Sequence, residues 1–239
     1  MVLYDNIVSS CLYSFLVSAR SRRSQPELTL WSYIVYPVHV NIIPPPLVEP
    51  VDARQAAVLE AAIGVFARFG FRKASMDEVA RAAGVSRQGL YLQFANKEEL
   101  FRKAVQHSLN NQLSAAAAAL ARGEDGLEIR LIAACDAWSG RFVGSLGADA
   151  ADLMCASTSL AGSTLAHYEA KFEQALTRAI TDSPLNGFCA TADLRPADLA
   201  RTLHATARGL KQSCASREEF VKGMTVAARM FCTPLTQHK

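Results

Sequence analysis

The sequence has none of the short motifs that mark the common enzyme classes. Its five histidines show no His-Glu-x-x-His or other metal-binding spacing. A Gly-x-Ser-x-Gly motif, a phosphate-binding loop and a dinucleotide-binding glycine pattern are also missing. Missing motifs do not exclude catalysis, but they leave no residues to carry it. We therefore expect no enzyme activity, no metal site and no cofactor.

Paired cysteines are lacking as well. A disulfide framework belongs to short secreted chains, and Cys-x-x-Cys pairs are absent here. This pattern favours reduced thiols and a cytoplasmic protein. We interpret the cysteines as small buried residues, with a redox-sensing thiol as the alternative. The six are Cys11, Cys135, Cys155, Cys189, Cys214 and Cys232.

The first fifty residues lack the sequence pattern expected of a membrane helix or a secretory signal. Their apolar run at 31–48 is broken by Pro37 and by the prolines at 44–46, which forbid a continuous helix. The basic start and clean apolar stretch of a signal peptide are missing. We expect residues 1–50 to be a poorly ordered extension, with a tether or interaction arm as the alternative, and we expect no membrane association.

Strand-like alternation is absent after residue 50, where apolar residues recur every three to four positions. This helical period predicts an all-α chain. Two short helices are expected after caps at Ser75 and Ser86, and another is expected from Asn96 into the alanine run at 115–119. The other expected helices span 52–69, 127–145, 150–160, 163–181, 196–214 and 217–231, with a loop at 182–194.

Residues 75–100 combine these signals in a helix-turn-helix order. Ser75 and Glu78 have the spacing of a capping box, and Gly84 supplies a turn before Ser86. This layout holds a short helix out as a probe for the DNA major groove. Charge agrees, because residues 52–104 contain nine Lys or Arg and six Asp or Glu, which equals the +3 net charge of the chain.

The stretch from Arg54 to Phe101 resembles the TetR family of bacterial regulators, of the TetR/AcrR type. The resemblance implies an N-terminal three-helix helix-turn-helix DNA-binding domain and a C-terminal helical domain that binds a small molecule and dimerises. The corresponding domains are residues 51–97 and 98–235. The matching elements, in order, are Leu59, Ala61–Ala62, Phe66, Gly70, Val79–Ala80, Ala83–Ser86, Leu90–Tyr91, Phe94 and Lys97–Leu100.

Candidate DNA contacts cluster at the starts of the third and fourth helices. The Arg87 fork suits guanine and the Gln88 amide suits adenine, while Gly89 allows close backbone approach. Lys97 begins a helix, where its ammonium and the helix dipole attract a phosphate. The resemblance implies a phosphate contact for the Tyr91 hydroxyl, for which an amphipathic packing role is the alternative. The further candidates are Gln93, Ser86 and Ser75, the last of which is alternatively a plain helix cap.

One short helix covers only a few base pairs, so we expect a homodimer on a near-palindromic double-stranded DNA operator. The last two helices carry apolar faces that either pair with a second copy as a four-helix bundle or pack internally. The resemblance implies a ligand-responsive switch, and we expect a repressor. The alternatives are an activator of the same fold and an adaptor that uses residues 1–50.

The effector is expected to be an apolar or aromatic small molecule, because the candidate lining residues are mostly aromatic. These side chains are alternatively part of the core, since aromatic residues at helical spacing are often buried. The candidates are Trp138, Phe142, Met154, His167, Tyr168 and Phe172.

Overall fold

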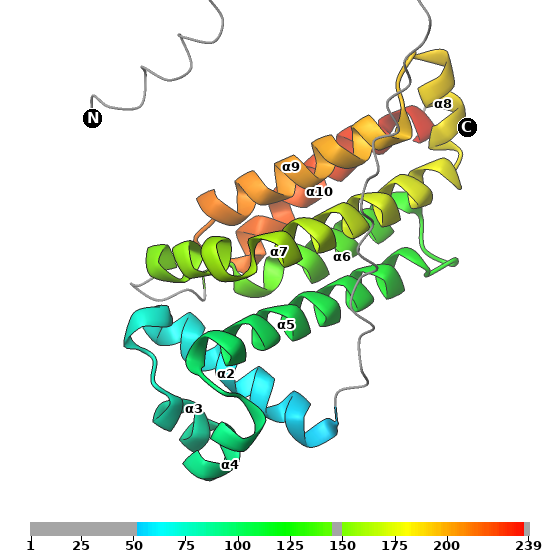
Figure 1. Cartoon of the computed structure of the whole chain (residues 1–239). Coiled ribbons are helices and arrows are strands. Elements are labelled where there is room, and N and C mark those ends of the chain that lie inside the picture. Colours follow the sequence, from blue (N-terminus) through cyan, green and yellow to red (C-terminus); the bar gives the residue numbers. More distant parts are fainter. Residues whose placement is uncertain (1–51, 145–149, 237–239) are drawn as a thin grey trace, which may run out of the picture. The chain divides into compact units, whose positions relative to one another are not determined.

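A computed structural model describes residues 52–144 and 150–236 (Figure 1). Within these ranges all regular structure is helical, which confirms the prediction of an all-α chain. None of the helices in this part is long and apolar enough to cross a membrane. The expected extension at residues 1–50 lies outside the described residues.

The head of the molecule consists of α2 (Ala53–Lys73), α3 (Met76–Ala82) and α4 (Arg87–Gln93) together with the first two turns of α5. The apolar stripe of α2 is buried against the other helices, as its spacing predicts. Gly70 breaks the regular helix at φ +76°, and one more turn follows to Lys73. The predicted end at residue 69 is therefore a kink inside the element. The main buried side chains of α2 are Val58, Leu59, Ala62, Val65 and Phe66.

Helix α5 (Lys97–Leu120) belongs to two hydrophobic cores. Near its start, Leu100 and Phe101 are fully buried in the head, where Phe101 packs edge-on against Phe66 at 5.0 Å between ring centroids. Toward its end, Ala116 and Leu120 are buried in the second core. One continuous helix thus joins the two parts.

The second part, called the body, is a bundle of α5, α6 (Leu127–Ser139), α7 (Ala150–Thr181), α9 (Pro196–Ser213) and α10 (Arg217–Thr236). The short helix α8 (Leu185–Thr191) covers one end. Figure 1 shows α3 and α4 at the end of the molecule remote from α9 and α10. The head and the last two helices are therefore separate surfaces.

Three predicted boundaries in the body were wrong. The helix predicted at 127–145 ends at Ser139, because a 3-10 turn (η1, Gly140–Phe142) redirects the chain and buries Val143. The helices predicted at 150–160 and 163–181 are one helix, α7. Its middle stays helical because Ala161 is buried there at 3% exposure.

The predicted loop at 182–194 contains α8. Pro184, Asn186 and Gly187 favour a turn, but Leu185 and Cys189 are both fully buried in the body core. Burial of these two side chains outweighs the local turn preference.

Two acidic side chains, Asp152 and Glu60, link α2 to the body. The backbone N–H of Arg72 donates to Asp152 Oδ2 at 2.8 Å, and Arg72 Nε lies 2.8 Å from Asp152 Oδ1. Glu60 accepts hydrogen bonds from Arg141 at 2.8 Å and from Asn111 at 2.9 Å. Movement of the head against α7 or η1 must therefore break or rearrange charged contacts.

Candidate nucleic-acid interface and internal pocket

The segment from α3 to α4 is shaped by two helix caps and one glycine. The Ser75 N–H donates to Glu78 Oε2 at 2.8 Å and the Glu78 N–H donates to Ser75 Oγ at 3.2 Å, which confirms the predicted capping box. Gly84 has φ +65°, a conformation that other residues rarely adopt. Ser86 Oγ accepts from the Gly89 N–H at 3.0 Å and caps α4. The turn thus fixes how α4 leaves α3.

Two buried side chains fix the rotation of α4. Leu90 is fully buried and Phe94 is 2% exposed, so this side of α4 faces the head core. The opposite side faces solvent and is rich in groups that donate and accept hydrogen bonds. Its exposed residues are Arg87, Gln88, Tyr91, Leu92 and Gln93.

Arg87 lies on this exposed side and contacts two neighbours. Its Nη1 donates to Asp77 Oδ2 of α3 at 3.0 Å, and its guanidinium lies 5.6 Å from the centre of the Tyr91 ring. The two partners of the ion pair have 65% and 50% of their side chains exposed. An ion pair so exposed is worth at most about 1 kcal/mol, so Arg87 is free to exchange Asp77 for another anion or for a base edge.

Lys97 at the start of α5 is held by the last turn of α2 and the residue that follows it. Its Nζ donates to the carbonyl oxygens of Arg72 at 3.2 Å and Ala74 at 3.1 Å, and it lies 4.7 Å from the centre of the Phe71 ring. An ammonium has three donors, so one remains for a phosphate. Lys97 therefore ties α5 to the end of α2 in addition to any role at DNA.

Three further candidates for DNA contact, Ser75, Gln93 and Gly89, differ in how many contacts they already make within the head. The Ser75 hydroxyl donates to Glu78 Oε2 at 2.9 Å while accepting from the Glu78 N–H, which agrees with the alternative of a plain helix cap. Gln93 is exposed and donates to the Gly89 carbonyl at 3.4 Å. A Cβ at Gly89 would lie 3.1 Å from Ser86 Oγ, so a larger residue there would press on the cap of α4.

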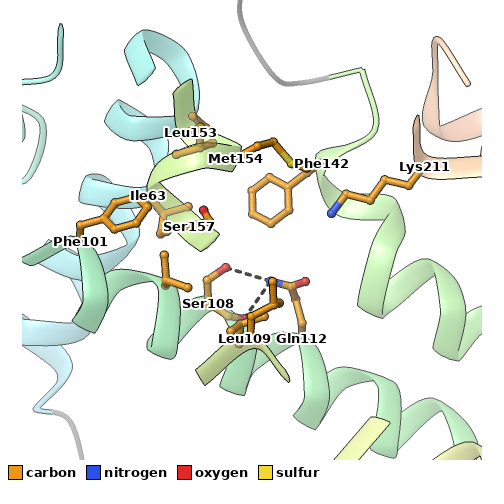
Figure 2. Close-up of a pocket in the computed structure, with 13 residues that line it drawn as sticks. Ile63, Phe101, Ser108, Leu109, Gln112, Phe142, Leu153, Met154, Ser157 and Lys211 are labelled. Atoms are coloured by element: carbon orange, nitrogen blue, oxygen red, sulfur yellow. Dashed lines mark hydrogen bonds between the residues drawn. The ribbon is translucent and has the colours of Figure 1, made fainter. Parts of the chain in front are cut away.

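A pocket of about 190 Å³ lies where α2, α5 and α7 meet (Figure 2). Ile63 comes from α2, Phe101 and Leu109 from α5, and Leu153 from α7. Apolar surface dominates the lining, and its single charged group is Lys211 of α9. The pocket therefore touches the head and the body at once.

The α2–α5 segment matches a known family. The sequence profile described as "Bacterial regulatory proteins, tetR family" aligns with residues 58–104, from the middle of α2 into α5. Over these residues the chain has the helix-turn-helix domain of the TetR family. The prediction made from the helix-turn-helix residues is confirmed. TetR proteins are transcription regulators and not an enzyme family, which agrees with our expectation that the chain is not an enzyme.

Curated TetR relatives are similar over the same part of the chain. An uncharacterised HTH-type transcriptional regulator, YfiR of Bacillus subtilis, is 45% identical over 62 residues, which are 26% of this chain and 30% of YfiR. The HTH-type transcriptional activator FasR of Mycolicibacterium smegmatis is 39% identical over 89 residues, which are 37% of this chain and 40% of FasR. The match thus spans less than half the length of these relatives.

Solved structures of transcriptional regulators share the fold of the body as well. A transcriptional regulator from Rhodococcus sp. RHA1 superposes with a TM-score of 0.57 at 19% identity, over 77% of this chain and 97% of the other. FadR of Bacillus subtilis, solved with stearoyl-CoA, superposes with a TM-score of 0.53 at 12% identity, over 73% and 96%. At these identities the similarity shows the fold alone, a helix-turn-helix head followed by a helical domain.

The body brings only two of the six predicted ligand residues, Phe142 and Met154, to the pocket. The remaining four do not line it. Trp138 stacks on Phe172 at 4.9 Å inside the body core. Tyr168 is 4% exposed in the same core.

The fourth of these residues, His167, is exposed and lies edge-on to the Tyr168 ring at 5.7 Å between ring centroids. Trp138 Nε1 also donates to His204 Nε2 at 3.3 Å, and His204 Nδ1 is 2.9 Å from Glu173 Oε1. These contacts are those of a packed core with its polar groups paired.

Two residues of interest were missed in the sequence. Leu92 is 81% exposed on α4, one turn after Gln88. It was not among the predicted DNA contacts, because an apolar residue two positions from the buried Leu90 gives no sign of a surface role. Lys211, near the end of α9, was not among the predicted ligand residues, but it lines the pocket. A lysine beside Leu210 on an amphipathic helix was the available signal, and it was too weak to use.

Proposed function

We propose that this TetR protein is a ligand-responsive transcriptional repressor that acts as a homodimer on a near-palindromic operator. The observation that carries the proposal is the exposed side of α4, held away from the head core by Leu90 and Phe94. A rigid short helix with free polar groups on one side suits entry into a major groove. Residues 51–97 are assigned to DNA binding and residues 98–235 to regulation and dimerisation as part of this proposal.

The exposed side of α4 offers two stripes for reading bases. Arg87 and Tyr91 lie one turn apart, and so do Gln88 and Leu92. The Arg87 fork suits guanine O6 and N7, the Gln88 amide suits adenine, and the Leu92 side chain suits a thymine methyl group. Lys97, Tyr91 and the Ser86 hydroxyl are assigned to phosphates, which position the helix without reading sequence.

The homodimer is assigned to α9 and α10. On α10, Phe220 and Met224 are fully buried in the body core, whereas Val226 and Met230 are 66% and 71% exposed. An apolar pair exposed one turn apart is unfavourable in water and suits pairing with a second copy. The helix thus has one face buried within its own chain and one face open to a partner. This supports in part both alternatives for α10, internal packing and pairing with a second copy.

Repression is the simpler mode of regulation, because a protein that occupies an operator is enough to block transcription. Activation needs a further surface that contacts the transcription machinery. Among the similar proteins, some are named activators and others are named negative regulators. FasR is named an activator, and IcaR of Staphylococcus epidermidis, 28% identical over 53 residues, is named a negative regulator of a biofilm operon. Transcription of a reporter fused to the operator decides the sign for this protein.

Binding to the DNA upstream of the protein's own gene tests the proposal. Purified protein should bind at two salt concentrations in the presence of unrelated competitor DNA, and the complex should contain two copies. Arg87→Ala should weaken binding by about 1–3 kcal/mol and relax the preference at one base pair. Arg178→Ala, which removes an exposed arginine from α7 of the body, is the matched control and should bind normally.

Two outcomes count against this reading of α4. If Arg87→Ala weakens binding to all sequences equally, Arg87 does not read a base. If binding sites selected from a random pool of duplexes show no preferred sequence for the unaltered protein, the chain is not a specific regulator.

A further inference from the structure

We infer that the pocket between α2, α5 and α7 binds a compact organic anion, with a carboxylate at Lys211 and an apolar body against α5 and α7. The inference deepens the proposed function, on which it rests, by naming the chemical class and the place of the effector. Its starting point is the contrast in the pocket between an apolar lining and one ammonium group.

Lys211 is half-buried and its Nζ forms no salt bridge within the described part of the chain. Among the residues described, it forms no hydrogen bond or ion pair, and its Nζ lies 5.7 Å from the centre of the Phe142 ring. Figure 2 shows the ammonium pointing toward Phe142. Burial lowers the pKa of Lys211, and the nearby charge of Glu169 opposes this shift only in part. A cation in such surroundings favours an anion beside it.

The polar groups of the lining are few, and some are already paired. Gln112 Nε2 donates to both the carbonyl and the hydroxyl oxygen of Ser108, at 3.1 and 3.0 Å. The Ser157 hydroxyl has no hydrogen-bond partner among the described residues, and it faces the same space in Figure 2. One cation and one hydroxyl suit a single carboxylate, whereas a sugar or a nucleotide needs many more partners.

The size of the pocket limits the apolar body of the ligand. A cavity of about 150 Å³ is known to accept benzene, and this pocket measures about 190 Å³. The space therefore suits one aromatic ring on a short chain, and a long acyl chain is larger than this volume. Phe101, Leu109 and Leu165 supply the apolar contacts for such a body.

The position of the pocket explains how its occupant would act on DNA binding. Ile63 belongs to α2 of the head, while Leu153 follows directly on Asp152, which holds the backbone of Arg72 at the end of α2. A ligand between these walls changes the packing of α2 against α7. Its effect on DNA is limited to its difference in affinity between the two arrangements.

Calorimetry of the full chain without DNA tests the inference, with 3-phenylpropionate as the probe and neutral 3-phenylpropanol as its isostere. The anion should bind at least tenfold more tightly than the alcohol. Lys211→Met, which keeps the apolar stem, should remove this preference and leave binding of the alcohol within threefold. Lys222→Met, which removes an exposed lysine from α10, is the matched control and should keep the preference.

Several results overturn the inference. They are no binding of 3-phenylpropionate, equal binding of the anion and the alcohol, an unchanged preference in Lys211→Met, and tighter binding of stearate than of the short acid. Lys211→Arg keeps the charge and should keep the anion preference, which guards against a change caused only by altered folding.

Operator binding is measured separately, so a protein that binds DNA but not the acid refutes this inference alone. A protein that binds the acid but not DNA refutes the proposed function alone.

Discussion

Replacing Lys97 with Met should destabilise the fold of the head as well as weaken DNA binding. In the structure the ammonium donates to the carbonyl oxygens of Arg72 and Ala74 and lies over the ring of Phe71. Met keeps most of the aliphatic stem, so the substitution removes mainly the charge and its donors. The test separates a structural role of Lys97 from a role at DNA alone.

The expected loss follows from these contacts. A hydrogen bond to a charged group contributes about 1.5–3 kcal/mol, and an exposed cation–π contact contributes about 0.5–1 kcal/mol. Water can reach this partly exposed site and replace some of the lost partners. We therefore expect Lys97→Met to lower the free energy of unfolding by about 2–3 kcal/mol, below the simple sum of the contacts.

Urea denaturation of the full chain measures this loss, and Lys103→Met is the control. Lys103 is exposed on the same helix, so its replacement should change the unfolding free energy by less than about 0.5 kcal/mol. The logarithmic salt dependence of DNA binding should fall by about one unit in Lys97→Met, because the third donor meets a phosphate. Equal unfolding free energies for Lys97→Met and the unaltered protein would refute the structural reasoning, and an unchanged salt slope would refute the phosphate contact.

Three further predictions follow from the fold. Gly84→Ala should lower the free energy of unfolding by about 1–2 kcal/mol, because Ala is strained at φ +65°, while Gly64→Ala in the helical interior of α2 should not. Burial raises the pKa of Glu60, but Arg141 and Asn111 outweigh it and hold the pKa below 4.5. The stability that Glu60 contributes is therefore present above pH 4.5 and lost as the pH falls further, and thermal unfolding of Glu60→Gln should lack this part of the acid sensitivity. Val226→Glu should give folded monomers in sedimentation if α10 forms the dimer, and a stable dimer would contradict that assignment.

Local signals in the sequence predicted the head well, because caps, turns and apolar spacing act over a few residues. Ser75 and Ser86 cap the helices that they were predicted to cap, and Gly84 takes the backbone conformation that its position required. The rotation of α4 followed from Leu90 and Phe94 for the same reason. These features need no knowledge of distant contacts.

Features that depend on distant contacts were not predictable from spacing. The continuity of α7 and the existence of α8 are decided by burial against other helices, as at Leu185. The carbonyl partners of Lys97 lie 25 and 23 residues earlier in the chain. Trp138 and Phe172 were assigned to a ligand pocket by residue type, but they stack on each other in the core. Residue type alone does not separate a pocket wall from a packed interior.

The sharing of α5 between the two cores bears on the construction of hybrid regulators. A head transplanted onto the body of another protein would be cut through its own core if the junction were placed at Lys97, because Leu100, Phe101 and Ala104 would be left behind. A junction after Ala104 keeps these side chains with α2 and α4, and it leaves the later turns of α5 to the recipient. A chimera that joins residues 52–104 to a foreign body should therefore keep its operator preference, whereas one that joins residues 52–97 should not fold its head.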